Sequence, residues 1–146
     1  MSDSGLIVVV SAGNSNMPAG NFSPGSSIWA LTVGATDNER KRLYFSNFGR
    51  VVDVYAPGQK TLSARSYWTL HGNNPQPDHR LNGVLDGTSM AAGYVSGLVA
   101  YLRSAHSGLN HPILVKEKIR SLGFLVDIDQ EVRQKPFIWN GVPPSS

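Results

Sequence analysis

Continuous runs of apolar residues predict three strands, of which the one at residues 6–10 is expected to be buried on both faces. The runs cover residues 6–10, 29–35 and 51–56, and turn-forming residues follow each of them. Unbroken apolar runs are typical of parallel sheets, in which both faces are covered. The segment 15–27 is rich in Asn, Ser, Gly and Pro and is expected to be a loop. Residues 59–86 show neither helical nor strand periodicity, so we expect a long irregular segment there.

A different spacing begins near residue 90 and predicts two helices. One apolar stripe at helical spacing covers residues 90–104, and its members are Ala91, Val95, Leu98, Val99 and Leu102. Gly93 and Gly97 lie inside this segment, although each glycine weakens a helix by about 1 kcal/mol relative to alanine. Their small size predicts a neighbour that packs closely against the helix. A second helix is predicted from Pro112 to a stop at Gly123.

Strands followed by helices predict an α/β domain with a small sheet. The segment 133–146 is expected to be coil with one short strand. A hydrophobic content of 40% against 16% charged residues excludes a disordered chain. The net charge of +3 comes from scattered basic residues, and we interpret the run at 40–42 as a solvated turn. No nucleic-acid partner is therefore expected.

Other classes of protein are excluded by what the sequence lacks. It contains no cysteine, which rules out disulfides, thiol catalysis and zinc fingers. No apolar run approaches the ~20 residues of a membrane helix, so no membrane partner is expected. The run at 6–10 is too short for the core of a signal peptide, and no basic region precedes it.

The strongest chemical signal is the hexapeptide Gly-Thr-Ser-Met-Ala-Ala at 87–92, where a loop becomes a helix. A serine at a helix N-terminus lies among unpaired backbone N–H groups and the positive end of the helix dipole. Those donors can stabilise an oxyanion that forms beside Ser89. The alternative interpretation is that Ser89, or Thr88 before it, only caps the helix.

This hexapeptide resembles the nucleophile motif of the subtilisin-like serine peptidases. Further segments follow the order and spacing of that family, at residues 9–14, 32–37, 45–49 and 52–58. Phe22-Ser23-Pro24 and Trp139-Asn140-Gly141 resemble the proteinase K-like, fungal branch. The resemblance implies an α/β fold with a mostly parallel sheet flanked by helices, of which residues 1–146 form the C-terminal part.

The resemblance also implies roles for individual residues in hydrolysis of a polypeptide substrate. Ser89 would be the nucleophile, and Asn14 would donate its side-chain amide to the oxyanion. Thr88 would support the oxyanion hole, with packing or capping as the alternative. The substrate residue before the cleaved bond would lie in a pocket lined by Ser11, Ala12 and Gly13.

A structural calcium ion is a further implication of the resemblance, whereas no cofactor is required for the chemistry. The matching ligands are the main-chain oxygens of Ile28 and Ala30 and the carboxylate of Asp53, since calcium takes oxygen ligands. The alternative is that Asp53 accepts hydrogen bonds from a turn.

The base that would activate Ser89 has no counterpart in this sequence. In subtilisin-like peptidases the Asp and His motifs precede the serine, and neither motif is present. None of the four histidines is expected to substitute, namely His71, His79, His106 and His111. We therefore expect an incomplete catalytic domain that lacks its N-terminal half, is inactive alone and exposes the apolar strand at 6–10. The family resemblance implies an extracellular location.

Two other hypotheses compete with a peptidase. One is a degenerate or truncated peptidase-like chain with a binding role or no independent activity. It is favoured by the missing base and by Gly93 and Tyr94, which stand where the family usually has proline and histidine. The other is a nucleotide-binding α/β domain, which is disfavoured because no glycine-rich phosphate loop is present.

Overall fold

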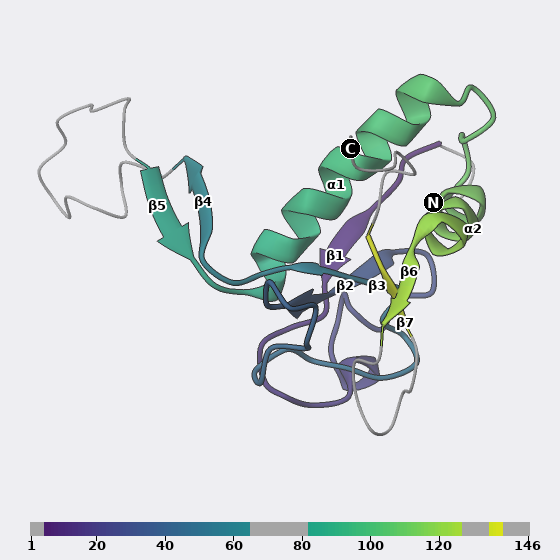
Figure 1. Cartoon of the computed structure of the whole chain (residues 1–146). Helices are drawn as coiled ribbons and strands as arrows, with labels where there is room; N and C mark the ends of the chain where they lie inside the picture. Colours follow the sequence, from purple (N-terminus) through teal and green to yellow (C-terminus); the bar gives the residue numbers. More distant parts are fainter. Residues whose placement is uncertain (1–4, 65–81, 127–134, 139–146) are drawn as a thin grey trace, which may run out of the picture.

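A five-stranded, mostly parallel sheet forms the centre of the molecule (Figure 1). In this computed structural model, residues 5–64, 82–126 and 135–138 are described. The strands in spatial order are β1 (Val9–Ser11), β2 (Leu31–Thr36), β3 (Val54–Pro57), β7 (Lys135–Phe137) and β6 (Phe124–Val126). The first four pair in parallel, and only β6 is antiparallel to its neighbour.

The three predicted strands are confirmed, with shifted ends. All six residues of β2 are buried, as expected for a strand with both faces covered. The expectation that residues 6–10 are buried on both faces is wrong, because β1 is an edge strand of half-buried residues. Leu6 is 63% exposed and Val8 is 38% exposed. This exposed apolar edge agrees with the expectation of an incomplete sheet.

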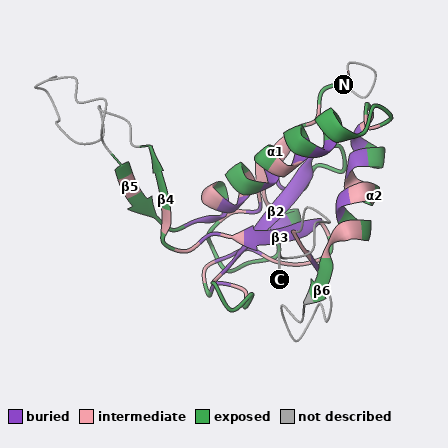
Figure 2. Cartoon of the chain, turned by 45° about the horizontal axis from the view of Figure 1, so that its top comes forward, coloured by how far each residue is buried: buried purple, intermediate pink, exposed green. Residues whose placement is uncertain are grey.

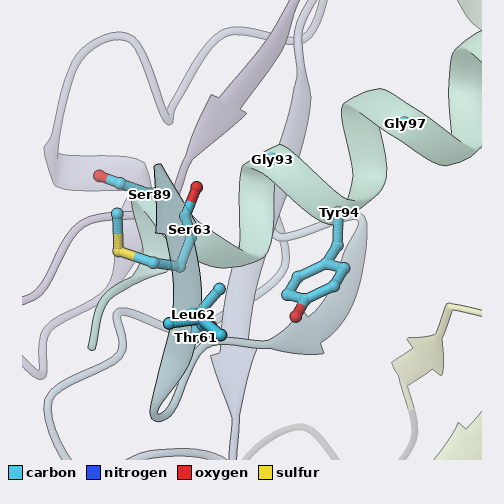
Figure 3. Close-up of a pocket in the computed structure, with 8 residues that line it drawn as sticks. Thr61, Leu62, Ser63, Ser89, Gly93, Tyr94 and Gly97 are labelled. Atoms are coloured by element: carbon cyan, nitrogen blue, oxygen red, sulfur yellow. The ribbon is translucent and has the colours of Figure 1, made fainter. Parts of the chain in front are cut away.

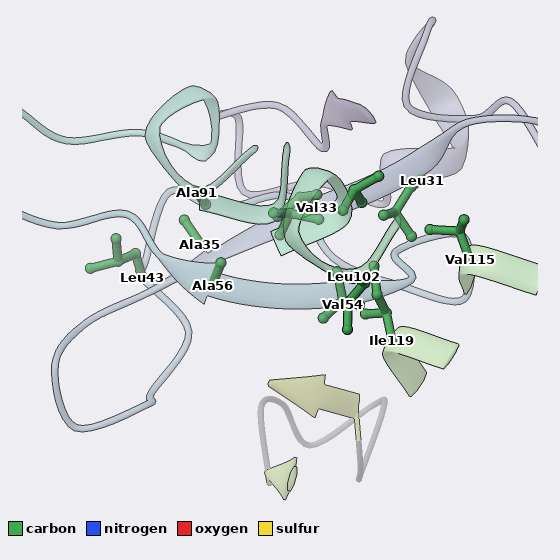
Figure 4. Packing of buried hydrophobic residues seen from close by; sticks show 12 residues of the cluster. Leu31, Val33, Ala35, Leu43, Val54, Ala56, Ala91, Leu102, Val115 and Ile119 are labelled. Atoms are coloured by element: carbon green, nitrogen blue, oxygen red, sulfur yellow. The ribbon is translucent and has the colours of Figure 1, made fainter. Parts of the chain in front are cut away.

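Both predicted helices are present, as α1 (Thr88–Ala105) and α2 (Pro112–Leu122). The predicted stripe of α1 packs on β2 and β3, although Leu98 is only partly buried. Both helices contribute to one core cluster with these strands (Figure 4), whose buried members are Leu31, Val33, Ala35, Leu43, Val54, Ala56, Ala91, Val95, Val99, Leu102, Val115 and Ile119. A smaller cluster around Tyr55 includes Ala19 of the short 3-10 helix η2 (Ala19–Asn21).

The expectation of an irregular segment at 59–86 is wrong at both ends. β4 (Thr61–Ala64) and β5 (Asn82–Leu85) form an antiparallel hairpin that projects from the body of the molecule (Figures 1 and 2). Its apolar side chains Leu62, Val84 and Leu85 are more than half exposed. Such strands show no buried face in the sequence pattern, because the described part of the chain supplies no layer to cover them.

Gly93 and Gly97 do not mark a close-packed neighbour, so that prediction is also wrong for the described residues. A Cβ atom added at either glycine would meet no atom within 4 Å. The α1 face that carries them, with Tyr94 and Tyr101 about half exposed, is therefore open. The strand β6 was not predicted. The predicted short strand near the C-terminus is β7, and the remainder of that segment lies outside the described residues.

Candidate active site

Ser89 is the second residue of α1, at the end of the helix where backbone N–H groups lack partners. Its side chain is exposed, whereas Gly87 and Thr88 beside it are buried. Ser89 also borders an open groove of about 500 Å³ between α1 and β4 (Figure 3). The groove is lined by Thr61, Leu62, Ser63, Ser89, Met90, Gly93, Tyr94 and Gly97. The serine is therefore accessible to a large molecule and lies in the positive field of the helix N-terminus.

Asn14 and Thr88 are joined by two hydrogen bonds, although they lie 74 positions apart in the sequence. The Asn14 Oδ1 atom accepts from the Thr88 backbone N–H at 3.0 Å and from the Thr88 hydroxyl at 2.7 Å. The Thr88 hydroxyl in turn accepts from the Gly13 backbone N–H at 3.2 Å. This chain of donors fixes which way the Asn14 amide faces, because the oxygen is held by Thr88.

The amide nitrogen of Asn14 is consequently left as a free donor. No described residue accepts a hydrogen bond from this Nδ2 atom, and it lies beside Gly87, next to Ser89. Gly87 has a φ of +154°, and a Cβ there would lie 3.5 Å from the Asn14 Nδ2 atom. The capping alternative is wrong, because the N-cap residue is Gly87 and no side chain caps the helix.

The side chain of Asn47 holds the loop that carries Asn14. Its residue type alone did not mark it as a functional residue in the sequence. Its buried side chain accepts from the Ser15 and Met17 N–H groups at 3.0 Å each and donates to the Ala12 carbonyl at 2.9 Å. Its Nδ2 atom would lie 2.4 Å from a Cβ at Gly13, which has a φ of +103°. The position of Asn47 inside the family-like segment 45–49 was the one available signal.

The predicted substrate-binding residues, Ser11, Ala12 and Gly13, end β1 and lead directly to Asn14. Ser11 and Gly13 are half-buried, whereas Ala12 is buried in the smaller core cluster. Ala12 donates its N–H to Val33 at 2.8 Å. The loop thus continues the sheet and brings Asn14 to the N-terminus of α1.

No base lies beside Ser89 within the described segments. The Ser89 hydroxyl has no hydrogen-bond partner there. His106 ends α1 at the opposite end of the helix, about 26 Å away at 1.5 Å per residue. His111 begins α2, and its Nδ1 atom accepts from the Ile113 N–H at 3.3 Å. His71 and His79 lie outside the described residues.

Two of the three predicted calcium ligands, Ile28 and the buried carboxylate of Asp53, are linked through Lys116. The Asp53 Oδ2 atom accepts a hydrogen bond from the Thr32 N–H at 2.9 Å, and Thr32 lies in β2 and not in the turn that the alternative proposed. The Arg120 guanidinium lies 2.5 Å from Oδ1, and the Lys116 ammonium lies 3.0 Å from Oδ2. Lys116 also donates to the Ile28 carbonyl at 3.0 Å. Ala30 is buried and directly precedes β2 in the sequence.

Two further observations concern the described segments. No group of three or more His, Cys, Asp or Glu side chains is gathered in them as a metal site. None of their helices has the length and apolar character needed to cross a membrane.

Comparison with known proteins bears on the family and the fold of this chain. The model of the subtilase family matches residues 1–122. The chain is 37% identical to a cuticle-degrading serine protease of Arthrobotrys oligospora over 134 residues, which are 92% of this chain and 30% of that protein. It is 43% identical to a subtilisin-like proteinase of Magnaporthiopsis poae over 118 residues, or 81% and 27% of the two chains.

A solved structure gives the same result for the fold. A cold-adapted subtilisin-like serine proteinase superposes with a TM-score of 0.73 at 28% identity, over 89% of this chain and 43% of that chain. The chain thus spans less than a third of the two curated relatives and less than half of the solved one. The matched fold, the family model and the identities together show that this chain belongs to the subtilase family.

Proposed function

We propose that this chain supplies the nucleophile and the oxyanion-binding groups of a serine endopeptidase. The observation that carries the proposal is the Asn14–Thr88 pair, which leaves the Asn14 amide donor free beside the exposed Ser89. A neutral donor of this kind is what a developing alkoxide on a peptide carbonyl requires.

The chemistry is acyl transfer followed by hydrolysis. The Ser89 Oγ atom attacks the substrate carbonyl while a base takes the hydroxyl proton, and the carbonyl π electrons move to the oxygen. The Asn14 Nδ2 group and the Ser89 backbone N–H donate to that oxyanion. The leaving amine takes the proton as the C–N bond breaks, and water then releases the acyl group. Thr88 is a positioning residue, because it holds Asn14 and touches no reacting atom.

The base and the remainder of the catalytic domain belong to sequence outside these 146 residues. We propose that residues 1–146 are the C-terminal part of the domain, that its N-terminal half is the partner, and that the chain alone is inactive. The support is the coverage of 27–30% in curated relatives and the absence of a base near Ser89 in the described segments. We also propose an extracellular, polypeptide-directed role, supported by the similarity to a cuticle-degrading protease.

A chain extended upstream tests this proposal. The 146 residues are joined to the part of the Magnaporthiopsis poae proteinase that precedes the matched region, and a fluorophosphonate probe is added. We expect Ser89 to be labelled and a peptide amide to be hydrolysed by the extended chain only, and Ser89→Ala to abolish both. A folded extended chain whose Ser89 stays unlabelled would contradict the peptidase proposal.

The alternative is a peptidase-like chain with a binding role or no activity. The open α1 face around Gly93 and Tyr94 favours it, because an unpartnered face is available to a binding partner. In that case the extended chain would fold without hydrolysing peptides, whereas Ser89-dependent hydrolysis would exclude this alternative.

A further inference from the structure

We propose that the ammonium group of Lys116 occupies the place of the calcium ion that the family resemblance implies, so that the Asp53 cluster binds no calcium while Lys116 is present. A covalently attached cation would then hold the Ile28 loop against the sheet. This cluster shares no residue with the Ser89 site, so its test is independent of the peptidase proposal.

The contacts of Lys116 match two of the three predicted calcium ligands. Its Nζ atom lies 3.0 Å from the Ile28 carbonyl oxygen and 3.0 Å from the Asp53 Oδ2 atom. A calcium ion that bound both oxygens would lie 2.3–2.6 Å from each. The ammonium group within hydrogen-bond distance of the same two oxygens leaves no room for that ion. The Lys116 side chain is only 13% exposed, so it is largely buried within this cluster.

The Asp53 carboxylate has little capacity left for a metal. Oδ1 accepts from Arg120, Oδ2 accepts from the Thr32 N–H, and the Lys116 ammonium forms an ion pair with the same Oδ2 atom. An ionised carboxylate offers about four lone-pair sites, of which two take hydrogen bonds while the Lys116 ammonium lies against Oδ2. Calcium needs about 6–8 oxygen ligands, so two of these cations would have to leave before the carboxylate could bind it in bidentate fashion.

The charge of the surroundings also opposes a divalent cation. A cavity of about 350 Å³ beside Asp53 is lined by three basic side chains, Arg50, Lys116 and Arg120, against two acidic ones, Asp53 and Glu117. Lys135 adds a further cation, because its Nζ atom donates to the Val52 carbonyl at 2.7 Å and the Arg50 carbonyl at 3.2 Å. A calcium ion would enter a region that is already positive, and like charges at short range repel.

Calcium dependence of unfolding is the first test. The midpoint of thermal unfolding of the 146-residue chain is measured in excess EGTA and in millimolar CaCl₂, together with calorimetric titration of calcium. We expect the same midpoint in both solutions and no stoichiometric binding. A calcium-dependent rise of the midpoint with one bound ion per chain would overturn the proposal.

Lys116→Met is the second test, because methionine keeps the length of the side chain and removes the charge and the donors. In EGTA we expect its midpoint to fall by about 10 °C, since one partner of a buried ion pair is lost. Calcium should restore part of this loss, and a variant that folds only with calcium would support the proposal equally. Lys41→Met is the matched control, because the Lys41 side chain is 72% exposed. A folded Lys116→Met chain that loses no more stability than Lys41→Met would overturn the proposal.

Chemical protection tests the same contact without a mutation. The chain is acetylated with an amine-reactive ester, and the rate at each lysine is followed by mass spectrometry. We expect Lys116 to react at least tenfold more slowly than Lys41, because its ammonium group is held by two oxygens. Equal rates at the two lysines would contradict the placement of Lys116.

Discussion

The Ser89 site and the Asp53 cluster both join distant parts of the chain, but they use polar groups in opposite ways. At Ser89, the Asn14 oxygen is held by Thr88, while the amide nitrogen and the serine hydroxyl have no partner among the described residues. At Asp53, both carboxylate oxygens bind cations, and Lys116 is bound to two oxygens. Catalysis requires polar groups with free bonding capacity, whereas a buried ion cluster is stable only when its capacity is filled.

The same contrast appears on the two faces of α1. The face with Ala91, Val95 and Val99 is buried against the sheet, whereas the face with Gly93 and Gly97 is open (Figure 2). Stability therefore comes from one side of the helix, and its N-terminus and other side are left for interactions beyond the described residues. Four changes sharpen this comparison.

Asp53→Asn should have the largest effect, on stability. The change leaves two cations, Lys116 and Arg120, without the buried carboxylate that holds them, and we expect a loss of about 3–5 kcal/mol in the free energy of unfolding. Urea unfolding measures it. Asp37→Asn is the control, because among the described residues this half-buried side chain accepts from the Glu39 and Lys41 N–H groups and forms no buried ion pair. Equal losses in the two variants would mean that the buried ion cluster contributes no more to the free energy of unfolding than the Asp37 turn does.

Asn14→Ala should act on the reaction and leave the fold intact. In the extended, active chain we expect kcat to fall by about 100- to 1000-fold with KM little changed, because one oxyanion donor is lost. Steady-state hydrolysis of a peptide amide measures it. Asn16→Gly is the matched control on the same loop, since glycine tolerates its φ of 52°. A fall in kcat no larger than that of Asn16→Gly would exclude Asn14 as the donor.

Asn47→Ala should weaken both the fold and the loop that carries Asn14, with a smaller effect. It removes three hydrogen bonds to the Asn14 loop, and we expect a loss of about 2–3 kcal/mol in stability. Hydrogen exchange of the Ser15 and Met17 amides should become faster than in the unmodified chain. Unchanged protection of both amides would show that the loop is held by other contacts.

The titration of Lys135 should have the smallest effect, which is a dependence of the free energy of unfolding on pH. Burial and the neighbouring Arg120 lower the pKa of Lys135 below its ordinary value of 10.5. Between the folded pKa and 10.5 the unfolded chain binds more protons, so stability should rise as the pH rises through this window. The stability of the unmodified chain minus that of Lys135→Met should therefore increase from neutral to alkaline pH. A difference that is constant or decreases would contradict the lowered pKa.

Local patterns made much of the fold predictable. The apolar runs located β2 and β3, and the helical stripe located α1, since these segments are buried and their periodicity reflects the core. The hydrophobic patterns were misleading for segments that the described residues do not bury. β1 was located, but it is a half-buried edge strand and is not covered on both faces. The β4–β5 hairpin projects from the body, and β6 has only three residues. Gly93 and Gly97 suggested close packing, but size alone does not tell whether a neighbour is present.

The sequence by itself determined the family, the α/β class and the choice of Ser89 and Asn14 as candidate site residues. These can be identified from the sequence because the motifs consist of specific residues in a specific order along the chain. Only the tertiary structure decided how Thr88 orients Asn14, how Asn47 holds the loop and which cation reaches Asp53. These contacts join residues 30 to 88 positions apart, through bonds such as Gly13 to Thr88 and Lys116 to Ile28. No local pattern encodes them, because they depend on how the parallel strands and the two helices bring distant side chains to the same place.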